Sequence, residues 1–202
     1  MKILHLSDTH NLHRELIDLP KADLIIHSGD ISFSGEGNEV MDFIDWFYKL
    51  DYKYKIFIAG NHDFCLDGKE SDVLQKFLPK NCYYLDKNGV RIENINFWGL
   101  PFFFSDDVSG FYDKSIEEIP SNTDILITHR PPFQILDRAG KINYGCSNLL
   151  KRVNEIKPKY HLFGHIHDSY GVVDNKTTVF ANSAIVNENY KISNQPFVFE
   201  YL

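Results

Sequence analysis

The sequence predicts an α/β fold in which two mixed sheets pack face to face and helices cover them. The first observation is a set of short apolar runs with the length and composition of buried strands. These runs span residues 3–6, 24–26, 56–59, 125–127 and 162–163. The second observation is helical spacing of apolar residues between the runs, and the third is a pair of tight-turn signals. Strands and helices therefore alternate in the first third of the chain, and antiparallel pairs enter later.

Three segments place apolar side chains at the spacing of a helix. Residues 40–50 carry them at positions 40, 43, 44, 47 and 50. Residues 73–78 show the same spacing before Pro79, and residues 149–156 show it before Pro158. Proline ends a helix because it lacks the amide hydrogen and clashes with the preceding turn. We expect three helices over these segments.

Two dipeptides predict turns between antiparallel strands. Asn88-Gly89 joins residues 83–85 to residues 90–92 and is a strong signal for a type I′ hairpin. The two residues fit because that turn requires positive φ at both central positions. Asp174-Asn175, between residues 172–173 and 178–180, is a weaker signal of the same kind.

The composition is that of an ordinary globular protein. Hydrophobic residues make up 43% and charged residues 24% of the 202 residues. A chain of this length can bury a core large enough for two sheets. No repeat, low-complexity tract or linker interrupts it. We therefore expect a single domain over residues 1–202.

Cys65, Cys82 and Cys146 are odd in number and widely spaced. They indicate neither a disulfide framework nor a thiolate metal site, and they favour a reducing compartment. The sequence has no charged N-terminal region and no apolar stretch of about 18 residues, so it carries no signal for export or a membrane span. We expect a cytoplasmic protein without a membrane partner. The sequence indicates no oligomeric state.

Polar residues follow the five apolar runs within a few positions. They are Asp8, His10, Asp30, Asn61, His62, Asp63, His129, His165 and His167. Because ligands gather beyond the carboxyl ends of strands in open α/β sheets, we expect these side chains to meet at one edge of the fold. Imidazole and carboxylate without thiolate suit Mn, Fe, Zn or a similar divalent ion. The pattern predicts a metal centre.

The nine histidines fall into three groups. His5, His27 and His161 lie inside apolar runs, where a histidine is more often a core residue bonded to the backbone than a ligand. His13 lies in a short amphipathic stretch that favours neither assignment. The other five all come just after a run. Any one of these five alone has a simpler interpretation as a turn residue, and it is the recurrence that favours the metal centre.

Several of these segments resemble, in order and spacing, the five motifs of the calcineurin-like metallophosphoesterases. They are Leu6-Ser-Asp-Thr-His10, Ser28-Gly-Asp30, Gly60-Asn-His-Asp63, Thr128-His129 and Gly164-His-Ile-His167. Residues 129–132, 144–146 and 163–171 are similar to the small metallophosphoesterase domain-containing branch. The resemblance runs from Met1 to about Tyr190. It implies an αββα sandwich of two mixed sheets flanked by helices.

The resemblance also implies two divalent metal ions that hydrolyse a phosphate ester together. Asp30 would bridge the two ions. Asp8, His10 and His167 would complete the first metal site, and Asn61, His129 and His165 the second. Two cations about 3.5–4 Å apart neutralise an anionic nucleophile and an anionic phosphate while they hold the attacking and leaving oxygens. A metal-bound hydroxide would then attack phosphorus in line.

His62 is not a ligand in the family pattern. A positioned imidazole can protonate a departing alkoxide, and we interpret His62 as the general acid. Asp63 would orient His62 by accepting its other ring proton, or would cap a helix. Asn61 would act as a metal ligand and also donate its amide to a phosphoryl oxygen of the substrate.

Arg130 departs from the family pattern, in which many relatives have glycine. Its guanidinium either binds a substrate phosphate or lies in solvent. Residues 97–104, continued by Phe111 and Tyr112, are rich in aromatic side chains. Core packing accounts for most of them, and one or two can stack on a nucleobase.

These observations predict a metal-dependent phosphoesterase that acts on a phosphodiester or a nucleotide. The net charge of −7 argues against duplex nucleic acid as a partner, since that binding depends on Lys and Arg. A small phosphorylated substrate fits better. The alternatives are a nuclease of the same superfamily and a non-catalytic nucleotide-binding or scaffold protein. The acidic balance disfavours the first, and the complete ligand set disfavours the second.

Overall fold

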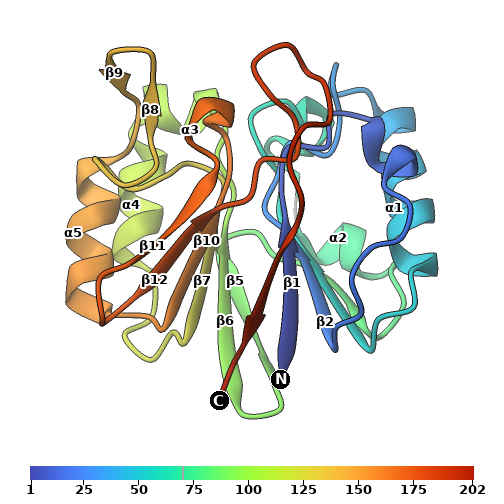
Figure 1. The fold of residues 1–202 in the computed structure, drawn as a ribbon, viewed down its shortest axis with the longest axis horizontal. Coiled ribbons are helices and arrows are strands. Elements are labelled where there is room, and N and C mark those ends of the chain that lie inside the picture. The colour runs from blue at the N-terminus through green and yellow to red at the C-terminus, as the bar shows by residue number, and fades with distance from the viewer. Residues whose placement is uncertain (70) are drawn as a thin grey trace.

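A computed structural model describes residues 1–69 and 71–202 as two large sheets between helices (Figure 1). The first sheet has the order β13-β1-β2-β3-β4, with strands Phe197–Glu200, Lys2–Leu6, Leu24–His27, Tyr54–Phe57 and Cys82–Tyr84. The second has the order β11-β12-β10-β7-β6-β5, with strands Gly171–Asp174, Val179–Asn182, Tyr160–Phe163, Ile125–Thr128, Ile95–Leu100 and Asn88–Ile92. A separate small hairpin pairs β8 (Arg138–Ala139) with β9 (Ile142–Asn143).

Helices cover both outer faces of the sheet pair. α1 (Gly37–Lys49) and α2 (Ser71–Gln75) lie against the first sheet, and α4 (Phe111–Glu117) and α5 (Ser147–Ile156) lie against the second (Figure 1). α3 (Phe104–Ser109) leads into α4, and short 3-10 helices span Leu12–Glu15, Phe64–Leu66 and His167–Ser169. This is the predicted αββα sandwich, so the fold class is confirmed. No helix in the described part of the chain has the length and hydropathy to cross a membrane.

Strand alternation produces three apolar clusters between the four layers. Within the first sheet, Ile3 packs between the sheets, whereas its neighbour Leu4 packs beneath α1. α1 adds Phe43 and Phe47 to the cluster on its side, which explains its apolar spacing. Each fully buried side chain of this kind contributes about 1.5–3 kcal/mol. The sheets are therefore held on both faces, and their carboxyl edges are fixed relative to each other.

Two of the three predicted helices are confirmed at nearly their expected bounds. α5 ends at Ile156, where Lys157 takes a positive φ of 52° ahead of Pro158. The helix predicted over residues 73–78 is wrong in extent, because α2 ends at Gln75. Phe77 beyond it is 80% exposed, so the apolar spacing there has no partner face that would stabilise a longer helix.

The predicted hairpin at Asn88-Gly89 is wrong. β4 belongs to the first sheet and β5 to the second, so the chain crosses between sheets at this point. β5 pairs with β6 instead, through a turn at Glu93 and Asn94 with φ of 48° and 67°, the left-handed pair that a type I′ turn requires. Gly89 lets β5 and β6 approach each other closely, since a Cβ there would lie 2.5 Å from the carbonyl oxygen of Phe97.

The weaker hairpin signal is confirmed. β11 and β12 pair antiparallel, and the amide of Asn175 donates to the carbonyl of Thr178 across the turn. The Asn175 side chain accepts hydrogen bonds from the amides of Thr177 and Thr178, which closes the turn as asparagine often does.

Candidate metal centre

All the polar segments predicted to meet do lie together, at the carboxyl edge of the sheets. Asp8 and His10 follow β1, Asp30 follows β2, and Asn61 follows β3 in the first sheet; His129 follows β7, and His165 and His167 follow β10 in the second. These strands are parallel within each sheet, so their carboxyl ends share one edge, at the top of Figure 1. The amide of Ser7 donates to the carbonyl of Ser183, which ties the two sheets together there.

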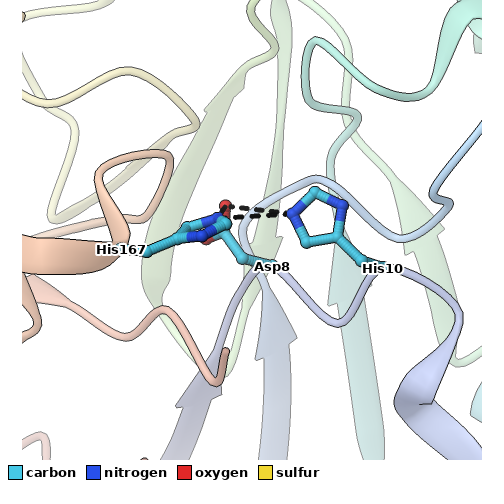
Figure 2. A group of neighbouring side chains, drawn as sticks. All are labelled: Asp8, His10 and His167. Atoms are coloured by element: carbon cyan, nitrogen blue, oxygen red, sulfur yellow. Dashed lines mark hydrogen bonds and ion pairs between the residues drawn. The ribbon is translucent and has the colours of Figure 1, made fainter. Parts of the chain in front are cut away.

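The first ligand group consists of Asp8, His10 and His167 (Figure 2). Asp8 Oδ1 lies 3.3 Å from His167 Nε2 and 4.0 Å from His10 Nε2. The two Nε2 atoms are 3.3 Å apart. Asp8 is fully buried, and the two rings approach each other beside its carboxylate (Figure 2).

The second ligand group consists of Asp30, His129 and His165. Asp30 Oδ2 lies 3.3 Å from His129 Nε2, and the amide oxygen of Asn61 lies 3.1 Å from the same nitrogen. Asp30 Oδ2 is also 3.6 Å from His10 Nε2, so this carboxylate stands between the two groups. The structure therefore brings all seven predicted ligands to one place.

Main-chain carbonyls orient three of the imidazoles. Nδ1 of His10 donates to Ser32 O at 3.2 Å, Nδ1 of His129 donates to Ser28 O at 2.9 Å, and Nδ1 of His167 donates to Asn187 O at 3.1 Å. A carbonyl only accepts, so in the neutral ring the proton sits on Nδ1 and the Nε2 lone pair faces inward. In the neutral rings these lone pairs face one another and carboxylate oxygens, an arrangement that favours a proton or a metal cation between them.

The carboxylates and imidazoles of the cluster shift one another's pKa values in the directions that favour positive charge there. Burial alone would lower the pKa of His129, but the charges of Asp30 and Asp8 raise it to about 9. Burial would raise the pKa of Asp8 and Asp30, yet His167 and His129 hold both pKa values below the usual range. Burial lowers the pKa of His165 to about 3, so His165 is neutral and has a nitrogen lone pair that can bind a metal ion. Nitrogen and oxygen donors of this kind fit a divalent transition metal ion.

The backbone is specialised at the ligands. Asp8, His10, Asp30 and His165 all have positive φ, between 41° and 70°, although none is glycine. Such conformations cost about 1–3 kcal/mol each and persist where function requires them. The motif glycines make room for the carboxylates: a Cβ on Gly60 would collide with Asp30, and a Cβ on Gly164 would collide with Asp8.

His62 lies beside the cluster, as predicted. Its backbone amide donates to Asp30 Oδ1 at 2.8 Å, and its Nδ1 donates to the carbonyl of Phe33 at 2.8 Å. Its ring centroid is 4.7 Å from that of His10, and one of its nitrogens lies within reach of Asp30 and His10. The ring also lines the cavity next to the ligands.

Asp63 neither orients His62 nor caps a helix, the two roles predicted from the sequence. Its buried carboxylate accepts hydrogen bonds from the amides of Gly60 at 2.7 Å and Ser32 at 2.9 Å, and from the Ser32 hydroxyl at 2.6 Å. His62 turns its Nδ1 to Phe33 instead, because adjacent side chains point in different directions along the loop. Asp63 makes no side-chain cap to the helix that follows it either. It fastens the loop carrying Asp30 to the loop carrying Asn61.

Arg130 has partners that the sequence did not indicate. Its Nη1 donates to Asp107 of α3 at 2.7 Å, and its Nε donates to the carbonyl of Tyr144 at 3.2 Å. The guanidinium also stacks over Phe102, 5.1 Å from the ring centroid. It therefore neither lies free in solvent nor lines the cavity beside the ligands.

The remaining histidines lie outside the cluster. His5, His27 and His161 are core residues as expected, but side-chain hydroxyls are their main partners: Ser28 and Ser183 for His5, Thr9 for His27 and Thr128 for His161. The backbone supplies one bond, from the amide of Gly29 to His27. His13 is buried against α1 and bonds Asp42 at 3.1 Å. In the aromatic stretch, Phe97 and Phe102 are core, whereas Phe104 is 55% exposed and lines the cavity.

The sequence did not reveal most of the cavity wall. Tyr190 packs edge-on against His10, with ring centroids 4.9 Å apart, and its own φ is 54°. The carbonyl of Asn187 accepts both the Tyr190 amide and His167 Nδ1, so this loop orients a ligand and places the tyrosine at once. No strand-end rule finds such a residue, because Tyr190 lies eight positions beyond the end of β12.

The four-layer fold and the imidazole and carboxylate groups at its edge are those of a metallophosphoesterase. The chain belongs to the calcineurin-like phosphoesterase family, whose model matches residues 1–169. Family membership supports a phosphoric ester hydrolase, and members of this family generally depend on metal.

Relatives of known sequence support this assignment. The chain is 34% identical to UPF0046 protein K07C11.7 of Caenorhabditis elegans, over 98% of this chain and 74% of that protein. It is 33% identical to human metallophosphoesterase domain-containing protein 1, over 96% of this chain and 69% of that protein. The fold matches GAP50, the anchor in the inner membrane complex of Plasmodium, with a TM-score of 0.58 at 12% identity, over 92% of this chain and 71% of that chain. The resemblance found in the motifs is confirmed.

Proposed function

We propose that the protein is a dinuclear phosphodiesterase whose substrates are phosphodiesters or nucleotides. The observation that supports this most directly is the position of Asp30 between the two ligand groups, 3.6 Å from His10 Nε2 and 3.3 Å from His129 Nε2. A carboxylate there suits the bridge between two ions about 3.5–4 Å apart. Mn, Fe, Zn or a similar ion matches the donor set.

Bound ions would supply charge neutralisation and an acidified water for in-line attack on phosphorus. The chain's own task is to hold the donors without further reorganisation. Three main-chain carbonyls fix the rings of His10, His129 and His167, and Asp63 fastens the loops of Asp30 and Asn61. Asn61 turns its amide oxygen to the second group, which leaves its NH₂ group for a phosphoryl oxygen.

His62 is the proposed general acid. Its Nδ1 is held by the carbonyl of Phe33, so a protonated ring has Nε2–H to give to the departing oxygen. Its place beside His10 and Asp30 and in the cavity wall supports this role. Because His62 lies so close to the cluster, it could also act as a metal ligand. Retention of the metal by His62→Ala would distinguish the general acid from a ligand.

Metal content and activity test the proposal together. Wild type should bind two ions per chain and hydrolyse bis(p-nitrophenyl) phosphate or members of a panel of cyclic and linear nucleotides with Mn, Fe, Zn or Mg added. Asp30→Ala should lose at least one ion and essentially all turnover. His161→Leu, a core substitution, should weaken folding and keep the metal stoichiometry. Asp30→Ala with two ions and near-normal turnover would remove the proposal, and loaded wild type inactive on every ester would indicate a binding protein.

We also place the protein in the cytoplasm. Three free thiols, Cys65, Cys82 and Cys146, support a reducing compartment. Fractionation of the source cells tests this directly.

A further inference from the structure

The cavity beside the ligand groups has a volume of about 390 Å³. The cluster residues Asp30, Asn61, His62, His165 and His167 form its floor. Aromatic and apolar side chains form much of the wall: Phe104, Ala139, Tyr144, Ile166 and Tyr190. They come from α3, the β8–β9 hairpin with the residue after it, the segment after β10 and the loop after β12, so separate parts of the chain line this space.

The charged part of the wall is entirely acidic. Asp168 and Glu188 line the cavity and are exposed, and neither forms a salt bridge with any residue that the structure describes. Glu188 accepts one hydrogen bond, from Asn189. No Lys or Arg is among the described residues lining the cavity. Arg130, one residue after a ligand, is already paired with Asp107.

This distribution of charge leaves no basic side chain in the described lining to bind an anion. Ions at the ligand groups would neutralise the phosphate itself, so the two carboxylates would act on the rest of the substrate. They repel a second anionic group and attract a cation. The faces of Tyr144, Phe104 and Tyr190 add to the same preference, because aromatic rings attract ammonium groups and bind quaternary ammonium ligands in particular.

We propose that the cavity selects phosphodiesters whose alcohol carries a positive charge, of the quaternary ammonium or protonated amine class. Neutral alcohols rank second and anionic alcohols last. The proposal rests on the phosphodiesterase function proposed above and specifies its substrate. The net charge of −7 acts in the same direction at longer range.

Three diesters with one reporter group test the order. Each contains p-nitrophenol as one alcohol, and the second alcohol is choline, ethanol or 3-hydroxypropionate. At low ionic strength we expect kcat/KM to fall about threefold to tenfold at each step from choline to ethanol to the carboxylate, the range for two partly screened charges. In about 0.5 M NaCl the differences should shrink, because the Debye length is then only a few ångströms.

Charge variants locate the effect. Asp168→Asn combined with Glu188→Gln should remove the preference, and Glu188→Lys should favour the anionic diester over the cationic one. Asp51→Lys is the matched control: it changes the net charge as Glu188→Lys does, but Asp51 is exposed just before β3, at the opposite edge of the sheet. It should leave the order of the three diesters unchanged.

A binding measurement accompanies the kinetics. Methylphosphonate esters of the same three alcohols lack the reporter leaving group, and calorimetry should rank their affinities in the same order. Activity on the ethyl diester with no ranking by charge would overturn this inference and leave the phosphodiesterase proposal intact. A ranking that survives the double variant would also overturn it. Inactivity on all three diesters, with no binding of the phosphonates, would instead refute the phosphodiesterase proposal.

Discussion

Replacing Asp63 with alanine should destabilise the protein more than any surface aspartate does. The Asp63 carboxylate is fully buried and accepts hydrogen bonds from the amides of Gly60, Ile31 and Ser32 and from the Ser32 hydroxyl. An orphaned buried donor costs about 1–3 kcal/mol, and four of them with partial relaxation give an expected loss of about 3–5 kcal/mol. That is a large share of the roughly 5–15 kcal/mol by which a typical domain is stable.

Urea unfolding of the chelator-treated protein, followed by circular dichroism, measures this loss. Asp45→Ala is the matched control, because Asp45 also has several partners but its side chain is 42% exposed. Its loss should stay below about 1 kcal/mol, as is usual for exposed ion pairs. Asp63→Ala should also weaken metal binding, since the loops of Asp30 and Asn61 would separate.

Two results would contradict this reasoning. One is an Asp63→Ala protein within about 1 kcal/mol of wild type, which would mean that the four donors find other partners or water. The other is a stable, metal-loaded Asp63→Ala protein with a selective loss on poor leaving groups. That pattern would restore the idea that Asp63 orients His62.

Three further predictions follow from the site and the core. His62→Ala should keep its metal and lose about 10²–10⁴ in kcat on alkyl or ribose esters but clearly less on p-nitrophenyl esters, since nitrophenolate leaves without a proton; equal losses on both would assign His62 to positioning. Arg130→Ala would lower kcat/KM by about 1.5–3 kcal/mol if the guanidinium bound the substrate phosphate; its pairing with Asp107 leads us to expect less than a threefold change, and a larger one would restore phosphate binding. Burial lowers the pKa of His161 from 6.5 to about 3, so the unfolded chain binds this proton more readily and stability is lost as pH falls from about 6.5 towards 3. His161→Leu should reduce that loss by up to about 1.4 kcal/mol per pH unit, and parallel stability curves for both proteins would contradict the prediction.

Strand ends and the meeting of the candidate ligand residues were predictable from the sequence because both follow from local rules. An apolar run indicates a buried strand, and the fold class determines the edge at which parallel strands end. Asp8 and His129 therefore meet, although 121 positions separate their numbers. The histidines inside the runs were equally predictable as core residues.

Features that depend on which segments become neighbours were not readable. Asn88-Gly89 has the composition of a turn, but the flanking strands join different sheets and no local rule reports that. Asp63 was assigned to His62 because the two are adjacent in sequence, whereas its partners lie 31 and 32 positions away and 3 positions away. The part of the cavity lined by Tyr190 and Glu188 depends on the loop after β12, which folds back beside the candidate ligands.

Each of the two ligand groups takes residues from both sheets, whereas a third set of neighbouring side chains that could hold a metal, His10, Asp30 and His62, comes from the first sheet alone. Asp8 and His10 come from the first sheet but need His167 from the second, and His129 and His165 of the second need Asp30 from the first. Metal binding would therefore link the two sheets of the sandwich at the edge where the ligand loops follow the strands. Loading should stabilise the folded protein by RT ln(1 + [M]/Kd) for each ion, where [M] is the free metal concentration, so the gain rises with the logarithm of that concentration. A substitution that shifts one sheet against the other, even deep in the apolar layer between them, would therefore first lower the metal affinity.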